Sequence, residues 1–202
     1  MLTLENISFY RNDNKIFERL SYTLSISSAL IITGKNGSGK SSLLKIIAGL
    51  YPLESGNILW GNENIKNFRN DFNGDLQYIG HKNFLKNNLT ILENLKFFSK
   101  IHDTELSINF ALNYFDLKNI QNIAIKNLSA GMKQRVLLAK LLCCPASIWL
   151  LDEPSTHLDN IQKEKLHGLI KTRIKDKGMV ILTTHDAMFF DLGPKLNLED
   201  FA

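Results

Sequence analysis

The stretch Gly34-Lys35-Asn36-Gly37-Ser38-Gly39-Lys40-Ser41 decides the fold, because it fits the pattern G-x-x-x-x-G-K-[ST] of a phosphate-binding loop, or P-loop. A short apolar run, Leu30 to Thr33, precedes it, and a pattern typical of a helix, Lys40 to Ala48, follows. Backbone N–H groups in such a loop point at phosphate oxygens, and the helix start adds its positive dipole end. We therefore expect residues 34–41 and the adjacent Ser42 to bind a nucleoside triphosphate. Lys40 would neutralise the β- and γ-phosphates, and Ser41 would ligate Mg²⁺.

Two further apolar runs end in residues suited to nucleotide chemistry. Ile148 to Leu151 is followed by Asp152 and Glu153, and the carboxyl ends of buried strands are where such sheets place groups beside a nucleotide. We expect Asp152 to hold Mg²⁺ through water and Glu153 to polarise the attacking water as general base. The run Met179 to Thr183 leads to His185. At the same edge of the sheet, its neutral imidazole is expected to contact the γ-phosphate and the lytic water.

Strand and helix patterns alternate along much of the chain, which indicates an α/β fold with a mostly parallel core sheet. Leu166, Ile170 and Ile174 recur every fourth residue and predict a helix before the strand at 179–183. Residues 1–30 and 56–60 alternate like strands and predict a small antiparallel β subdomain. Helical patches at 91–101 and 106–115 predict a helical lobe over about residues 85–126. We expect a single domain, 1–202, with its core at 1–84 and 127–202.

The composition excludes several classes of protein. A hydrophobic content of 44% over 202 residues supports a compact core and excludes intrinsic disorder. No segment reaches the roughly 18 apolar residues of a membrane-spanning helix, and no signal-peptide pattern is present, so we expect the chain to stay in the cytoplasm. The net charge of +4 comes with scattered lysines, so no nucleic-acid partner is expected. Cys143 and Cys144 match no metal or disulfide spacing and are interpreted as small buried hydrophobes.

The segment Leu128-Ser129-Ala130-Gly131-Met132 opens an amphipathic helix, with Ser129 in the position of an N-cap. With this segment in place, the ordered motifs resemble the nucleotide-binding subunits of ABC transporters, whose signature reads LSGGQ. Ser155 to Asp159 is similar to their D-loop. The resemblance covers nearly the whole chain and implies a P-loop NTPase of the ABC ATPase type that hydrolyses ATP with Mg²⁺. It also implies membrane-spanning partner subunits and a head-to-tail dimer, in which Ser129 and Gly131 of one copy cover the γ-phosphate held by Lys40 of the other.

A closer resemblance rests on the segment from Ile79 to Leu95. A Gly80-His81 pair stands in the place of the usual Q-loop glutamine, and Leu92-Glu93-Asn94-Leu95 follows. This segment is similar to the haem-exporter type of ATPase from cytochrome c maturation. The resemblance implies a peripheral protein at the cytoplasmic face of the inner membrane, bound to membrane subunits of the cytochrome c maturation type, with no haem bound by this chain itself. A surface around Phe84 to Leu95 is expected to receive a helix of the membrane subunit, because the apolar residues Phe84, Leu85, Leu89 and Leu92 cluster there. The alternative is that these residues pack the helical lobe.

Some positions depart from the family pattern. Met132 replaces the usual signature glutamine, and Ala130 replaces the second glycine. Arg11 stands near the position from which the family usually stacks an aromatic ring on adenine, so Tyr10 or Phe17 is expected in that role. Two alternatives stay open: the ATPase of an exporter for another solute, and a regulatory module that holds ATP without turnover. Glu153 and His185 argue for hydrolysis.

Overall fold

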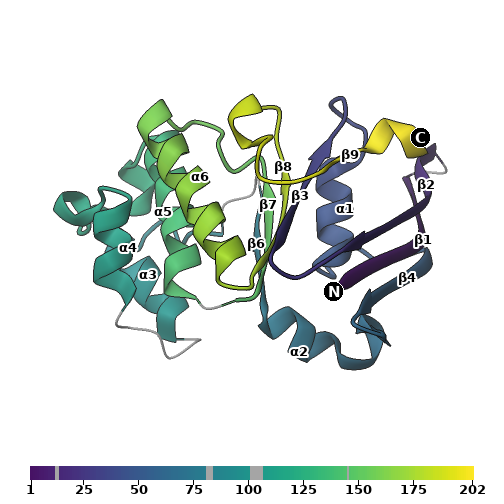
Figure 1. Cartoon of the computed structure of the whole chain (residues 1–202). Helices are drawn as coiled ribbons and strands as arrows, with labels where there is room; N and C mark the ends of the chain where they lie inside the picture. The colour runs from purple at the N-terminus through teal and green to yellow at the C-terminus, as the bar shows by residue number, and fades with distance from the viewer. Residues whose placement is uncertain (12–13, 81–83, 101–106, 145) are drawn as a thin grey trace.

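The computed structural model describes residues 1–11, 14–80, 84–100, 107–144 and 146–202 (Figure 1). Two sheets and a group of helices make up this part of the chain. In chain order, with η for a turn of 3₁₀ helix, the elements are β1 (Leu2–Arg11), β2 (Asn14–Leu24), β3 (Ser28–Thr33), α1 (Lys40–Ile47), β4 (Ser55–Trp60), β5 (Glu63–Asn64), η1 (Ile65–Phe68), α2 (Arg69–Gly74), β6 (Leu76–Ile79), α3 (Ile91–Lys100), α4 (Ile108–Tyr114), η3 (Lys118–Ile120), η4 (Ile125–Asn127), α5 (Ala130–Cys143), β7 (Ile148–Asp152), α6 (Asn160–Lys175), β8 (Met179–Thr183), η5 (Ala187–Phe189), β9 (Lys195–Asn197) and η6 (Leu198–Phe201).

The core sheet is parallel, with the strand order β6-β7-β8-β3-β9. Its register aligns the ends of the three central strands, because Thr183 of β8 pairs with both Ile32 of β3 and Asp152 of β7. The residues that follow these strands therefore meet at one edge of the sheet. The expected α/β fold with a parallel core sheet is confirmed.

The central strands β3, β7 and β8 are apolar on both faces, as a parallel sheet covered on both sides requires. In β3, Leu30 and Ile32 face the apolar core that contains α1 and the antiparallel sheet, whereas Ala29 and Ile31 face the core that contains α3 to α6. Figure 1 shows α1 between the two sheets and the other large helices on the far side of the core sheet. The side-chain period of two in a strand produces this division. It places the helix that follows the P-loop between two sheets.

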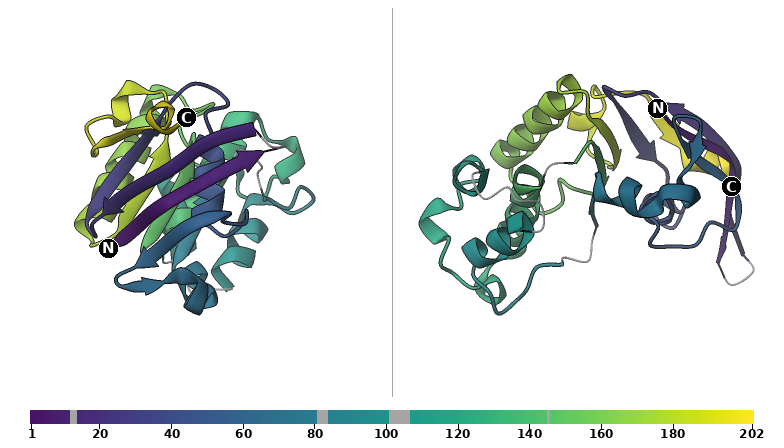
Figure 2. Two further views of the ribbon diagram at one scale, coloured as in Figure 1. Left: turned by 90° about the vertical axis from the view of Figure 1, so that its right-hand side faces the viewer. Right: turned by 90° about the horizontal axis from the view of Figure 1, so that it is seen from below.

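The second sheet is antiparallel, with the strand order β2-β1-β4-β5. Figure 2 shows β1 and β2 as two long neighbouring strands. Leu4, Ile7 and Phe9 of β1 are buried in the same apolar core as α1. The expected antiparallel subdomain is thus confirmed. In the ranges given above, no helix combines the length and the apolar content that crossing a bilayer requires.

A reciprocal pair of hydrogen bonds fixes the start of α3. The Thr90 backbone N–H donates to Glu93 Oε2 over 2.8 Å, and the Glu93 N–H donates to Thr90 Oγ1 over 3.2 Å, which is a capping box. Helix α5 contacts both α3 and α4 and shares their apolar core. The expected boundary at residue 127 places α5 in the core of the domain. Because α5 packs against the lobe helices α3 and α4, the packing of the lobe extends past this residue.

The sequence pattern gives no signal for β6, β9 or α2. Strand β6 is four residues long and carries a polar Gln77 that is buried and donates to the Cys144 carbonyl. Strand β9 has three residues and α2 has six. Periodicity over so few residues cannot separate strand, helix and loop. These elements are specified by pairing and packing with distant parts of the chain.

Candidate active site

The P-loop joins β3 to α1 and encloses the ammonium group of Lys40. Lys40 Nζ donates to the carbonyl oxygens of Gly34 at 2.6 Å and Lys35 at 3.0 Å, and the side chain is buried. Gly39, the residue before α1, has φ of +98°, and a Cβ there would lie 2.5 Å from Ile16 Cγ2. Only glycine meets both conditions without strain. The loop therefore holds a positive charge at the N-terminus of a helix, which is a favourable place for phosphate.

Asp152 connects the P-loop helix to the core sheet. Its Oδ1 accepts hydrogen bonds from Ser41 Oγ at 2.9 Å and from Thr183 Oγ1 at 2.8 Å. Thr183 is a residue of the site that motif reasoning does not single out; only the sheet register reveals it. The hydroxyl of Ser41 and the carboxylate of Asp152 are adjacent oxygen donors, the ligand type that Mg²⁺ prefers. These residues fit a magnesium ion.

Glu153 has a left-handed backbone, with φ of +50°. Its N–H donates to both the carbonyl and the hydroxyl of Thr183, at 3.1 and 2.9 Å. His185 Nε2 lies 3.6 Å from Glu153 Oε1, and the carboxylate is the more shielded of the two side chains, at 19% exposed against 57%. Non-glycine residues in this backbone region cost free energy and cluster at functional sites. The strained turn places an acid and a histidine side by side.

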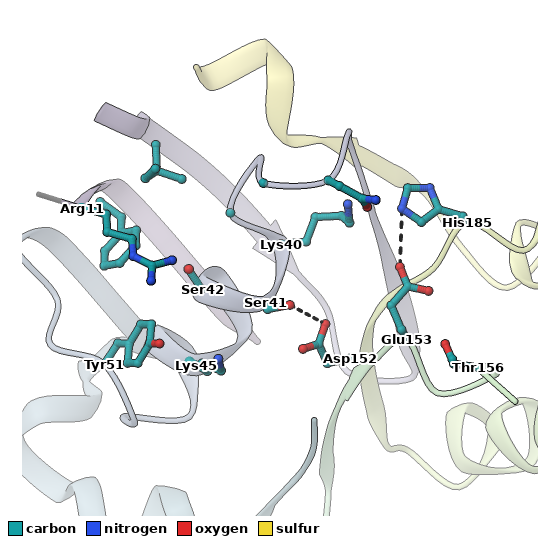
Figure 3. A pocket seen from close by; sticks show the side chains of 15 residues that line it. Arg11, Lys40, Ser41, Ser42, Lys45, Tyr51, Asp152, Glu153, Thr156 and His185 are labelled. Carbon is teal, nitrogen blue, oxygen red and sulfur yellow. Dashed lines mark hydrogen bonds and ion pairs between the residues drawn. The ribbon is translucent and has the colours of Figure 1, made fainter. Parts of the chain in front are cut away.

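A pocket of about 510 Å³ brings most of the expected site residues together (Figure 3). Lys40, Ser41 and Asp152 lie in the middle of the view, and Glu153 and His185 face each other at one end. The residues that line it are Phe9, Arg11, Ile16, Asn36, Gly37, Gly39, Lys40, Ser41, Ser42, Lys45, Tyr51, Asp152, Glu153, Thr156 and His185. An elongated anionic ligand on the P-loop could therefore reach the acid and histidine with one end.

The opposite end of the pocket is lined by Arg11 and Tyr51 (Figure 3). The Tyr51 ring stacks on Phe9 at 5.9 Å between centroids, and Lys45 Nζ lies 5.1 Å from the centre of the same ring. Phe17, expected as an adenine-stacking candidate, is fully buried, so its ring has no free face for a base. Tyr10 is not among the lining residues. Sequence position alone could not find Tyr51, because it lies forty residues from Arg11 along the chain.

The signature segment lines a separate pocket of about 290 Å³ that shares no lining residue with the first. Ser129 Oγ accepts a hydrogen bond from the Met132 N–H at 3.2 Å and so caps α5, as expected. Gly131 has a packing reason as well, because a Cβ there would lie 2.6 Å from the His157 carbonyl oxygen. Asp159 lies in the same pocket and caps α6 through the Gln162 N–H at 2.8 Å. Leu128, the first residue of this segment, is buried, and Ala130 is the first residue of α5.

His81, the expected Q-loop residue, lies outside the described residues. Tyr78, three positions earlier, has a buried hydroxyl close to the place that a Cβ on Gly80 would occupy, so glycine there has a structural reason. Burial, aided by the nearby Asp152 carboxylate, raises the pKa of the Tyr78 phenol. The phenol therefore stays neutral beside the site for magnesium.

The expected apolar surface around Phe84 is only partly present. Phe84 is 60% exposed, but Leu85 is buried in the lobe core, and Leu89 and Leu92 are half-buried. Leu85 belongs to the lobe core and Leu92 packs against it, so the four residues do not form one exposed surface. The contact of a membrane subunit around Phe84 to Leu95 stays a prediction. Phe97 on α3 is exposed, and Lys86 Nζ lies 4.1 Å from the centre of its ring.

The site combines a P-loop, an acid pair at the end of one strand and a histidine after the next strand. Together with this fold and the separate signature pocket, these features define an ATPase of the ABC type. A family model described as ABC transporter matches residues 17–156. The chain belongs to this family.

Two curated relatives within this family are similar to the chain over most of its length. The chain is 40% identical over 193 residues to the cytochrome c biogenesis ATP-binding export protein CcmA of Aliivibrio fischeri, which covers 95% of both chains. It is also 40% identical over 187 residues to the protein of the same name in Wolbachia pipientis wMel, covering 93% of this chain and 90% of the relative.

Solved structures share the fold. A putative ABC transporter ATP-binding protein from Pyrococcus furiosus superimposes with a TM-score of 0.85 at 23% identity, over 100% of this chain and 98% of the other. An ATP-binding cassette solved as a dimer in a post-hydrolysis state with ADP and Pi gives a TM-score of 0.78 at 24% identity, over 96% and 91% of the two chains.

Proposed function

We propose that the chain hydrolyses ATP at the pocket between the P-loop and His185, as the ATP-binding subunit of the exporter complex in cytochrome c biogenesis. The observation that carries the proposal is the Glu153–His185 pair at one end of the pocket whose floor is the P-loop. The relatives named for cytochrome c biogenesis support this export process over another solute, and the Gly80-His81 pair agrees with the haem-exporter type. A module that only holds ATP would not need this acid and histidine.

The residues divide the chemistry between them. Lys40 and the loop N–H groups would hold the β- and γ-phosphates, and phosphoryl transfer needs mainly such positioning and charge neutralisation. Glu153 would accept a hydrogen bond from the attacking water and act as its general base. His185 would contact both the γ-phosphate and this water. Magnesium, bound by Ser41 directly and by Asp152 through water, would supply charge neutralisation at the phosphates.

The nucleoside end of ATP would lie at Arg11 and Tyr51. Phosphates on the P-loop with the γ-phosphate at Glu153 leave the base at the opposite end of the pocket, where these two residues lie. The Tyr51 ring offers a stacking face, and the Arg11 guanidinium is planar and stacks well on π-systems. We propose these two side chains in place of Tyr10 or Phe17.

Two copies would complete each site. The signature residues Ser129 and Gly131 are in a pocket separate from Lys40 of the same chain. A head-to-tail dimer would bring the signature of one copy, with Met132 and Asp159 beside it, to the γ-phosphate on the other. Closing and reopening of this dimer would drive the membrane-spanning subunits, with the chain held as a peripheral subunit at the cytoplasmic face of the inner membrane. Neither haem nor nucleic acid is proposed as a ligand of this chain.

The substitution Glu153→Gln tests the proposed chemistry. It removes the base and keeps the phosphate site, so we expect ATP hydrolysis to fall about a hundredfold or more while ATP binding is retained. Phosphate release and the dissociation constant of a fluorescent ATP analogue are the two measurements. Lys40→Ala is the matched variant, for which binding itself should be lost. Normal turnover in Glu153→Gln would remove Glu153 from its proposed role.

A further inference from the structure

One face of α6 lies along the segment that carries His185. Lys163, His167 and Lys171 are spaced four residues apart, so they lie on one side of the helix. Lys163 Nζ lies 2.7 Å from Asp186 Oδ2. One and two turns later, His167 Nε2 and Lys171 Nζ lie 2.7 and 2.9 Å from the two oxygens of Asp191. The helix thus meets the chain after β8 through two carboxylates.

Asp186, which is the less exposed of the two carboxylates, also forms the turn that follows His185. The Asp186 N–H donates to Thr184 Oγ1 at 3.0 Å, and Asp186 Oδ1 accepts from the Met188 N–H at 3.1 Å. The turn then continues into η5, whose Phe189 is fully buried with its ring edge against His167. The backbone on both sides of His185 is therefore held, although the imidazole itself is more than half exposed.

The ion pairs made by the two lysines, Lys163–Asp186 and Lys171–Asp191, differ in their exposure to water. Lys163 and Asp186 are 26% and 23% exposed, whereas Lys171 and Asp191 are 49% and 54% exposed. Pairs open to water contribute little, because solvent screens the charges and both side chains lose entropy. The Lys163 ammonium, 2.7 Å from Asp186 Oδ2, lowers the pKa of the Asp186 carboxyl, so this group stays ionised at neutral pH. The less exposed pair is the one able to fix the position of the turn.

We infer that Lys163 and Asp186 are positioning residues for ATP hydrolysis, which hold His185 against Glu153 from the far side of the turn. Neither side chain is among those that line the nucleotide pocket, so we expect their effect on hydrolysis to pass through His185. The inference rests on the proposed role of His185. A shift of the imidazole by about 1 Å is enough to lower a rate by up to about a hundredfold.

The first test compares Lys163→Met with Lys171→Met, which breaks the exposed pair on the same helix face. We expect kcat to fall on the order of tenfold in Lys163→Met, with the ATP dissociation constant within about twofold of that of the unchanged protein. Lys171→Met should keep both values. Asp186→Asn is a second variant that retains the hydrogen bond to the Met188 N–H and loses the charge, and it should lose kcat to a similar extent. Unchanged kcat in either Lys163→Met or Asp186→Asn would overturn the inference.

The second test separates positioning from general stability. In single-turnover measurements, Lys163→Met should add no further loss to His185→Ala, because there is no imidazole left to position. Losses that multiply would show that Lys163 acts elsewhere and would also overturn the inference. If His185→Ala alone hydrolyses ATP normally, the proposed role of His185 fails first. If it is slow while Lys163→Met is normal, only the positioning inference fails.

Discussion

Glu153 shows how much a single backbone conformation contributes to the site. Its left-handed φ of +50° costs about 1–3 kcal/mol. Two hydrogen bonds from its N–H to Thr183 hold the residue there. Thr183 also donates to Asp152, so one threonine supports both acids. The acids can be predicted from the strand that ends in them, whereas the threonine that supports them belongs to a strand about thirty residues away and cannot.

The base end of the pocket gives a prediction for single residues. Tyr51→Ala should weaken ATP binding by about fivefold or more, because stacking of a base on an aromatic ring contributes about 1–3 kcal/mol. Inorganic tripolyphosphate, which has no base, should bind Tyr51→Ala as it binds the unchanged protein. Competition with a fluorescent ATP analogue measures both affinities.

Tyr10→Ala is the matched variant for this prediction, since its side chain does not line the pocket. It should leave ATP affinity within about twofold. A loss of ATP affinity in Tyr10→Ala with none in Tyr51→Ala would show that the base binds at Tyr10 on β1 and not at Tyr51.

At the scale of elements, the long periodic segments are predictable and the short ones are not. Helix α5 and strands β7 and β8 follow from their apolar runs, because burial on a whole face leaves a pattern in the sequence. The leucines near Phe84 have the same apolar character, yet Leu85 is buried and Phe84 is exposed. The difference depends on how the loop before α3 turns. Asn94 fixes that loop by accepting from the Lys86 N–H at 2.8 Å and donating to the Thr90 carbonyl at 2.9 Å.

This loop and α3 carry the prediction for contact with a membrane subunit. Phe84→Asp should keep the ATPase activity of the isolated subunit, because the residue does not line the nucleotide pocket. It should lower recovery with the membrane fraction by about tenfold, since an exposed aromatic anchor dominates many interfaces. Sedimentation of membranes that contain the partner subunits measures the bound fraction.

Phe110→Asp is the control, because Phe110 on α4 is exposed to a similar degree, 58% against 60%. It should sediment normally. Equal recovery of the two variants would place the membrane contact away from Phe84.

At the scale of the whole molecule, two apolar cores on either side of one sheet determine where the chemistry lies. The P-loop helix belongs to one core and α5 and α6 to the other. The P-loop and the acids are predictable because each is a local pattern beside an apolar run. The positions of Arg11, Lys45 and Tyr51 in the pocket cannot be predicted in this way, because they depend on how the antiparallel sheet is placed against α1. Cys143 and Cys144 are both buried, as expected, and burial raises the pKa of Cys143 to about 12, so this thiol stays neutral and unreactive at physiological pH.

The separation of the P-loop pocket from the signature pocket has a consequence for mixtures of damaged chains. Lys40→Ala keeps an intact signature, and Ser129→Arg keeps an intact P-loop, but in the proposed head-to-tail dimer neither variant would form a complete site with a copy of itself. A dimer of one of each would have one complete site, so the two inactive proteins should complement each other. Random pairing of equal amounts would restore roughly a quarter of the unaltered activity, measured as phosphate release after mixing. If the mixture stays inactive, the two pockets do not meet across the dimer. If activity recovers, a chain without its P-loop lysine still contributes its signature segment to the site of its partner.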